Sequence, residues 1–219
     1  MTQGQPRGFL ALPPTGQGPA VLVLHAWWGL NDTIKTFCTR LAEAGFVAFA
    51  LDLYHGQVTD TIAGAEALGS ALDANQLQAQ AEIAAAVNFL SQLEGQPAGG
   101  VAVIGFSLGA YYALVLAAAA PAQIGSVVLF YGTGGGDFSA AKADFLGHFA
   151  ANDPYEPPAN VEALAATLRQ SGRQVTFYQY PDTGHWFFEP DRTDAYHPDA
   201  ASLAWERTLA FLKRSAMTL

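Results

Sequence analysis

The chain has 219 residues, of which 51% are hydrophobic and 13% are charged, so it can bury one large core and is too apolar to be intrinsically disordered. Its formal net charge of −9 at pH 7 disfavours binding to phosphate backbones and to anionic lipid surfaces, so neither nucleic acid nor a membrane is an expected partner. The single cysteine, Cys38, excludes an internal disulfide.

Twelve segments carry the patterns of strands and helices. Apolar runs with strand character alternate with longer segments of helical periodicity along most of the sequence. In chain order, the expected elements are the strand Ala20–Leu24, the helix Ile34–Ala44 capped by Asn31 or Asp32, the strand Phe46–Leu51, the helices Ile62–Leu72 and Gln76–Leu93, the strand Val101–Phe106, the helix Leu108–Ala119, the strands Ser126–Tyr131 and Phe145–Ala150, the helix Val161–Gln170, the strand Val175–Tyr180 and the helix Ala200–Arg214.

The predicted strands are apolar without alternation, which is typical of strands that are covered on both faces. Strands and helices in regular succession predict an α/β fold with a mostly parallel central sheet and helices on both sides. The sequence has no internal repeat and no linker-like block, so we expect one domain over residues 1–219. The segment Met1–Leu12 lacks an apolar core of signal-peptide length, and no run approaches the ~18 apolar residues of a membrane span. We therefore expect a cytoplasmic protein.

The most informative motif is Gly-Phe-Ser-Leu-Gly at 105–109, between a predicted strand and a predicted helix. A Gly-x-Ser-x-Gly motif in this context is typical of a nucleophile elbow, because small residues on either side allow a tight, strained turn. The turn would lift the Ser107 hydroxyl above the sheet. It would also direct the helix N-terminus towards an oxygen that becomes negative during acyl transfer.

A serine nucleophile needs a general base, and three histidines follow Ser107 in the chain. His185 comes directly after the last predicted strand, on a loop at the carboxyl edge of the sheet, and is the predicted base. His148 lies in or near a strand, as a satisfied core histidine would. His197 precedes the last helix, so it is expected at the surface or as a helix cap.

The predicted acid is Asp153, which follows the apolar segment that ends near Ala151. It would fix the imidazole tautomer and stabilise the imidazolium. The alternatives are Asp137, Asp144 and Asp182, although Asp182 is too near His185 in sequence to approach it from a separate strand end.

These residues belong to a larger pattern that resembles the dienelactone hydrolase family, a group of carboxymethylenebutenolidase-like α/β-hydrolases. The resemblance implies hydrolysis of an ester or lactone without a cofactor. It also implies an oxyanion hole formed by the backbone N–H groups of Trp27 and Leu108. The matching segments are Leu24–Asn31, Ala50–Tyr54, Gly105–Gly109, Gly147–Asp153, Tyr180–His185 and Ala204–Leu212.

The chain departs from the family pattern at three places. The best-known members carry a cysteine where Ser107 stands and a glutamate where Ala26 stands, so a conventional serine–histidine mechanism is expected here. Family members hold a substrate carboxylate with arginines, but the position four after His185 is Glu189, and no Lys or Arg occurs between Arg40 and Lys142. A negative Glu189 facing an anionic substrate would repel it, so we expect that substrate carboxylates are not preferred. Cys38 shares a helical face with apolar residues and is read as core.

Several aromatic residues lie near predicted strand ends, where they would form an apolar pocket. His25 is expected to position the oxyanion loop, Asp52 to be structural, and the glycine-rich segment Gly132–Gly136 to form a loop beside the site. No spacing of ligands indicates a metal. The predicted pocket residues are Trp27, Trp28, Tyr54, Phe106, Trp186 and Phe187.

The sequence thus predicts a serine hydrolase that cleaves a small-molecule ester or lactone through Ser107, His185 and Asp153. A thioesterase or an acyl transferase on the same triad is the first alternative, because the acyl half of the chemistry is identical. A non-catalytic ligand-binding protein of the same fold is the second. The expected assembly is a monomer or a homodimer.

Overall fold

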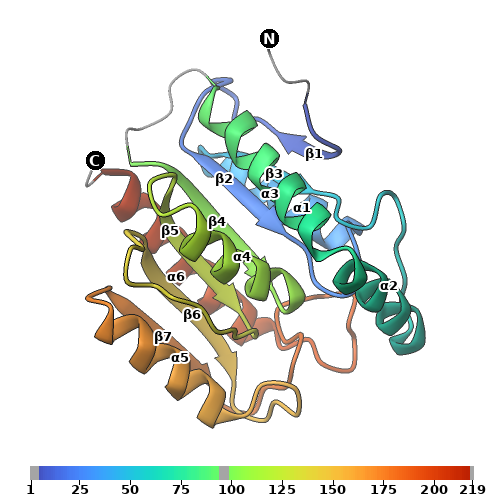
Figure 1. The fold of residues 1–219 in the computed structure, drawn as a ribbon. Coiled ribbons are helices and arrows are strands. Elements are labelled where there is room, and N and C mark those ends of the chain that lie inside the picture. Colours follow the sequence, from blue (N-terminus) through green and yellow to red (C-terminus); the bar gives the residue numbers. More distant parts are fainter. Residues whose placement is uncertain (1–4, 94–98, 218–219) are drawn as a thin grey trace.

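The computed structural model describes residues 5–93 and 99–217 and is organised around one seven-stranded sheet (Figure 1). The strand order is β1-β3-β2-β4-β5-β6-β7, with β1 antiparallel to its neighbour and every other pair parallel. The elements are β1 (Gly8–Ala11), β2 (Ala20–Leu24), α1 (Asp32–Glu43), β3 (Val47–Leu51), α2 (Ile62–Ala74), α3 (Gln76–Ser91), β4 (Val101–Phe106), α4 (Leu108–Ala119), β5 (Ile124–Phe130), β6 (Asp144–Ala150), α5 (Pro158–Gln170), β7 (Val175–Tyr180) and α6 (Pro198–Met217).

Both faces of the sheet are covered, and each face has its own apolar core. Leu22 and Val103 belong to the core shared with α3, α4 and α5, whereas Val23 and Ile104 belong to the core shared with α1 and α6. Neighbouring strand residues point to opposite faces, and both faces are buried, so the strands read as continuous apolar runs. Figure 1 shows α4 and α5 on one side of the sheet and α6 on the other. The predicted α/β-hydrolase fold is confirmed.

The strand β1 was not predicted from the sequence. It lies within the segment Met1–Leu12, of which residues 1–4 fall outside the described part of the chain. It has only four residues, all half-buried, and it pairs with β3 at the edge of the sheet. A short half-buried edge strand lacks the apolar run by which the other strands were found.

Other element boundaries differ from the prediction by a few residues. Tyr131 was expected to end a strand, but its φ of +36° takes it out of β5. The helix α5 begins at Pro158, three residues earlier than expected, because proline suits the first turn of a helix. Asn31 caps α1, and its side chain accepts a hydrogen bond from the Ile34 N–H, as one of the two expected caps.

The parallel strands bring three predicted site residues to one edge of the sheet. Ser107 follows β4, Asp153 follows β6, and His185 follows β7, each at the carboxyl end of its strand. In open α/β sheets this edge is where ligands bind. Among the described residues, no helix has the length and apolar character needed to cross a membrane.

Candidate active site

Ser107 lies on a strained turn between β4 and α4. Its φ of +49° and ψ of −110° fall outside the regions that a serine normally adopts. A Cβ atom at Gly105 would collide with the backbone of Gly109, and one at Gly109 would collide with the carbonyl oxygen of Leu24. Glycines at both positions therefore allow the turn, the helix and the neighbouring strand to pack together.

His185 links Ser107 to Asp153 by two hydrogen bonds. The Ser107 Oγ lies 2.9 Å from His185 Nε2, and His185 Nδ1 lies 2.7 Å from Asp153 Oδ2. The other Asp153 oxygen, Oδ1, accepts hydrogen bonds of 2.9 Å and 3.1 Å from the backbone N–H groups of Tyr155 and Glu156. Both the imidazole and the carboxylate are almost fully buried, at 4% and 1% exposed.

The partners of His185 determine its tautomer. An ionised carboxylate can only accept a hydrogen bond, so Nδ1 carries the proton and donates to Asp153. The neutral imidazole then has its lone pair on Nε2, where it accepts the hydrogen bond of the Ser107 hydroxyl. This arrangement can remove a proton from the serine as it attacks a carbonyl carbon.

The other histidines that follow Ser107 lie elsewhere. His148 is buried in β6, with its ring nitrogens 2.8 Å from the Tyr180 hydroxyl and 3.0 Å from the Thr208 hydroxyl, and burial lowers its pKa to about 3. The His197 side chain accepts a hydrogen bond from the Ala200 N–H in the first turn of α6. Both observations agree with the roles expected from the sequence.

None of the three alternative acids is hydrogen-bonded to His185 among the described residues. Asp137 is exposed, and hydrogen bonds from the side chain and the backbone N–H of Ser139 lower its pKa. Asp144 starts β6 at the opposite end of that strand. Asp182 lies in the turn after β7 with a φ of +57°.

A cavity of about 250 Å³ opens over Ser107 and His185. Leu108 is the first residue of α4, so its N–H has no acceptor within the helix. Trp27 lines the same cavity from the loop after β2, so both proposed oxyanion donors belong to residues beside the serine. The residues that line the cavity are Trp27, Ser107, Leu108, Tyr111, Thr133, Tyr155, Glu156, His185 and Trp186.

Of the predicted pocket residues, only Trp27 and Trp186 line this cavity. Phe106 is buried in the core, where its ring stacks on that of Phe130 at 4.6 Å. Trp28 is buried behind Trp186, with 5.0 Å between their ring centroids. The prediction was wrong for these residues because a position near a strand end does not fix the direction of the side chain.

The prediction also fails for Tyr54 and Phe187. Tyr54 lies beneath α2, where it lines a different pocket, and Phe187 is fully buried. Burial raises the pKa of Tyr54 well above its usual range.

Glu189 does not face the cavity, contrary to the expectation that it would repel an anionic substrate there. It is fully buried, and its Oε1 accepts a 2.6 Å hydrogen bond from the Tyr131 hydroxyl. Burial raises the pKa of Glu189 to about 8. Tyr131 in turn lies against His185, with 5.0 Å between their ring centroids.

Three further sequence predictions concern residues around the site. His25 is buried; its Nδ1–H donates to the Ala26 carbonyl at 2.7 Å and its Nε2 accepts from the Leu53 N–H at 3.2 Å, so it connects the segments that follow β2 and β3. Asp52 is buried beside Arg7, with 3.5 Å between their charged atoms, and is structural. Cys38 is fully buried in α1, where burial raises the pKa of its thiol.

Four residues that line the cavity were not predicted from the sequence. Tyr155 and Glu156 follow Asp153 by two and three positions, and Tyr111 lies one helical turn after Ser107. Their proximity to predicted catalytic residues was the available signal. Thr133 lies in the glycine-rich loop that was expected beside the site.

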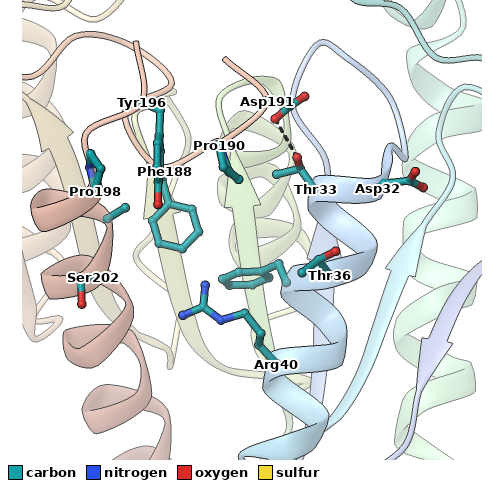
Figure 2. Close-up of a pocket in the computed structure, with 12 residues that line it drawn as sticks. Asp32, Thr33, Thr36, Arg40, Phe188, Pro190, Asp191, Tyr196, Pro198 and Ser202 are labelled. Carbon is teal, nitrogen blue, oxygen red and sulfur yellow. Dashed lines mark hydrogen bonds between the residues drawn. The ribbon is translucent and has the colours of Figure 1, made fainter. Parts of the chain in front are cut away.

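A larger cavity, of about 570 Å³, lies between α1 and the start of α6 (Figure 2). Arg40 and Thr36 reach it from α1, and Tyr196 and Phe188 reach it from the loop before α6. The guanidinium of Arg40 lies 4.1 Å from the centre of the Trp205 ring. Its described lining contains no histidine, so no serine–histidine pair is available there.

Comparison with known proteins connects this geometry with a family. The model of the dienelactone hydrolase family matches residues 7–216. Protein usf of Aquifex pyrophilus is 33% identical over 214 residues, which cover 94% of this chain and 92% of usf. A Bradyrhizobium protein named "Probable 2-oxo-3-(5-oxofuran-2-ylidene)propanoate lactonase" is 33% identical over 227 residues, covering 97% of this chain and 91% of that protein.

The fold also matches solved structures. The crystal structure of a dienelactone hydrolase-like promiscuous phosphotriesterase from metagenomic libraries superposes with a TM-score of 0.80. The two chains are 22% identical, and the match covers 97% of this chain and 88% of the other. At this identity the likeness concerns the fold alone.

Proposed function

Because the chain belongs to the dienelactone hydrolase family and is a carboxylic ester hydrolase, we propose that it cleaves its ester or lactone through Ser107, His185 and Asp153 by way of an acyl-enzyme. The observation that carries the proposal is the continuous hydrogen-bonded series from the Ser107 hydroxyl through His185 to Asp153. Trp27 and Leu108, whose backbone N–H groups are the proposed oxyanion donors, line the same cavity as Ser107.

The proposed reaction begins when Ser107 Oγ attacks the substrate carbonyl carbon while His185 Nε2 takes the hydroxyl proton. Asp153 stabilises the imidazolium that forms, and the N–H groups of Trp27 and Leu108 hold the oxyanion. The tetrahedral intermediate collapses, the C–O bond to the leaving group breaks, and His185 protonates the departing alcohol. Water then attacks the acyl-enzyme with His185 as base, which releases the acid and restores Ser107.

The replacement of two family residues supports a serine mechanism. A thiol is far more acidic than a hydroxyl, so a cysteine enzyme must control the charge of its nucleophile before substrate binds. Here the position of the family glutamate is Ala26, which is buried and brings no charge to Ser107. The serine depends on its general base instead, and His185 lies within hydrogen-bonding distance of it.

The substrate class that we propose is a small ester or a lactone. The name of the Bradyrhizobium relative describes a lactonase, and a lactone ring opens by the same attack on a carbonyl carbon. The cavity volume of about 250 Å³ suits a small acyl or alcohol group.

Hydrolysis of short-chain p-nitrophenyl esters by the wild type and by Ser107→Ala tests this proposal. We expect the variant to lose at least about three orders of magnitude in kcat, as removal of a triad nucleophile does in serine proteases. A serine-directed fluorophosphonate should label the wild type and leave the variant unlabelled. Equal activity of the two proteins would show that Ser107 is not the nucleophile. A wild type that neither hydrolyses the esters nor reacts with the fluorophosphonate would favour the alternative of a non-catalytic binding protein.

A further inference from the structure

The cavity over Ser107 is lined by aromatic rings and an acidic side chain. Rings from Trp27, Tyr111, Tyr155 and Trp186 line it together with one acidic side chain outside the proposed triad, that of Glu156. No Lys or Arg belongs to the described lining. A cavity of this composition cannot neutralise a substrate carboxylate by an ion pair.

Tyr155 is in ring contact with three other residues that line the cavity, Trp27, Trp186 and His185. The ring centroid of Tyr155 lies 6.0 Å from that of Trp27, 5.2 Å from that of Trp186 and 5.0 Å from that of His185. Their interplanar angles of 74°, 49° and 54° arrange them as walls rather than as one stack. Faces of Trp and Tyr rings attract cations through the ring quadrupole, most strongly where water is excluded.

Glu156 is held in place within this cavity. Its Oε1 accepts a 2.9 Å hydrogen bond from the Thr133 N–H, and its Oε2 accepts a 2.6 Å hydrogen bond from the Thr133 hydroxyl. The backbone N–H of Glu156 donates to Asp153 Oδ1, so its main chain is hydrogen-bonded to the proposed acid. Across the described part of the chain, no ion pair involves Glu156, whereas Asp153 is paired with His185.

We propose that this cavity selects esters or lactones that carry a quaternary or protonated ammonium group, which the aromatic rings enclose and Glu156 balances. The inference rests on the proposed function and names its substrate class. The negative charge of the whole chain and the absence of Lys and Arg between Arg40 and Lys142 act in the same direction, because they attract cations and repel anions. A cationic substrate would be hydrolysed by the same steps that are proposed above for esters and lactones.

Three acetate esters of similar size distinguish the effect of substrate charge on turnover from the effect of substrate shape. These are 2-(trimethylammonio)ethyl acetate, its neutral isostere 3,3-dimethylbutyl acetate, and the anionic 3-carboxypropyl acetate. We expect kcat/KM at low ionic strength to be roughly tenfold higher for the cation than for the neutral isostere, and lowest for the anion.

The variant Glu156→Gln keeps the shape of the side chain and its hydrogen-bonding capacity towards Thr133 while removing the charge. The ratio of cation to neutral ester, measured within this variant, should fall several-fold towards one. Glu162→Gln is the matched control, because Glu162 is an exposed carboxylate on α5 outside the cavity and its loss should leave the ratio unchanged.

Binding supplies a readout that does not depend on turnover. Tetramethylammonium should quench tryptophan fluorescence in Ser107→Ala as it does in the wild type, and it should do so more weakly in Glu156→Gln. A wild type that hydrolyses the neutral ester as fast as the cation, prefers the anion, or binds no tetramethylammonium overturns the inference and leaves the proposed function standing. A wild type whose ester hydrolysis does not depend on Ser107 overturns the proposed mechanism instead.

Discussion

The Tyr131 hydroxyl donates a 2.6 Å hydrogen bond to a buried carboxyl oxygen of Glu189, directly behind the imidazole of His185. Tyr131 has a φ of +36°, and Ser107 and Trp186 also have positive φ values in the same region. Bulky residues adopt such backbone conformations only when the surrounding structure holds them there. The Tyr131–Glu189 hydrogen bond links the segment after β5 to the loop after β7.

Removing the Tyr131 hydroxyl should destabilise the protein. Glu189 Oε2 already has no hydrogen-bond partner among the described residues, so Tyr131→Phe would leave the whole buried carboxyl without one. We expect a loss of about 1–3 kcal/mol in the free energy of unfolding, measured by urea denaturation. Tyr196→Phe, at a tyrosine that is 37% exposed, is the control. Equal stability of the two variants would show that the hydrogen bond contributes little.

The buried carboxyl of Glu189 should make stability fall as the pH rises. Burial is the main cause that raises its pKa from 4.5 to about 8, so the folded state holds a proton that the unfolded state releases. This contribution to stability is complete below about pH 4.5 and is lost progressively as the pH rises to about 8. Glu189→Gln cannot ionise, so its Tm relative to the wild type should increase between pH 5 and pH 9. Parallel Tm curves for the two proteins would contradict this.

The proposed role of Asp153 can be tested without changing its shape. In Asp153→Asn the amide oxygen can still accept the hydrogen bonds from Tyr155 and Glu156, but its NH₂ group then faces His185 and favours the wrong tautomer. We expect kcat to fall by about 10⁴-fold, the loss seen for the same change in a serine protease triad.

Asp182→Asn is the matched control for that experiment. Asp182 precedes His185 by three residues and has a φ of +57°, which asparagine tolerates well. Its activity should stay within a few-fold of the wild type. A fall of less than tenfold for Asp153→Asn would show that the acid does not orient the base.

The sequence was sufficient for features that depend on local pattern and chain order. The parallel strands are buried on both faces and were recognisable as apolar runs, and Ser107 was recognisable from a motif whose glycines have a steric purpose. His185 and Asp153 follow from the positions of loops after strands. None of these inferences requires knowledge of how side chains pack.

The pocket could not be predicted in the same way, because it depends on side-chain direction. Phe106 and Ser107 are adjacent in sequence, yet one ring packs into the core and the other side chain enters the cavity. Glu189 was aligned with a substrate-binding arginine, but the chain turns it inwards towards Tyr131. The position of Tyr155 over the imidazole depends on the fold of the loop that follows β6.

Substitution of Gly109 tests the strained turn at Ser107 without changing any proposed catalytic side chain. A Cβ atom there would lie 2.8 Å from the His25 carbonyl oxygen and still closer to Leu24, and these backbone atoms cannot rotate away. In Gly109→Ala the strand β2 must therefore move from α4, and the loop that carries the Trp27 N–H must move with it. We expect a loss of about 1–3 kcal/mol, which corresponds to a Tm decrease of several degrees, together with a lower kcat/KM in the folded protein. Gly135→Ala is the matched control, because nothing lies within 4 Å of its added Cβ, and it should retain both stability and activity. If Gly109→Ala matched that control in both measurements, close packing of α4 against β2 would not be what holds the elbow.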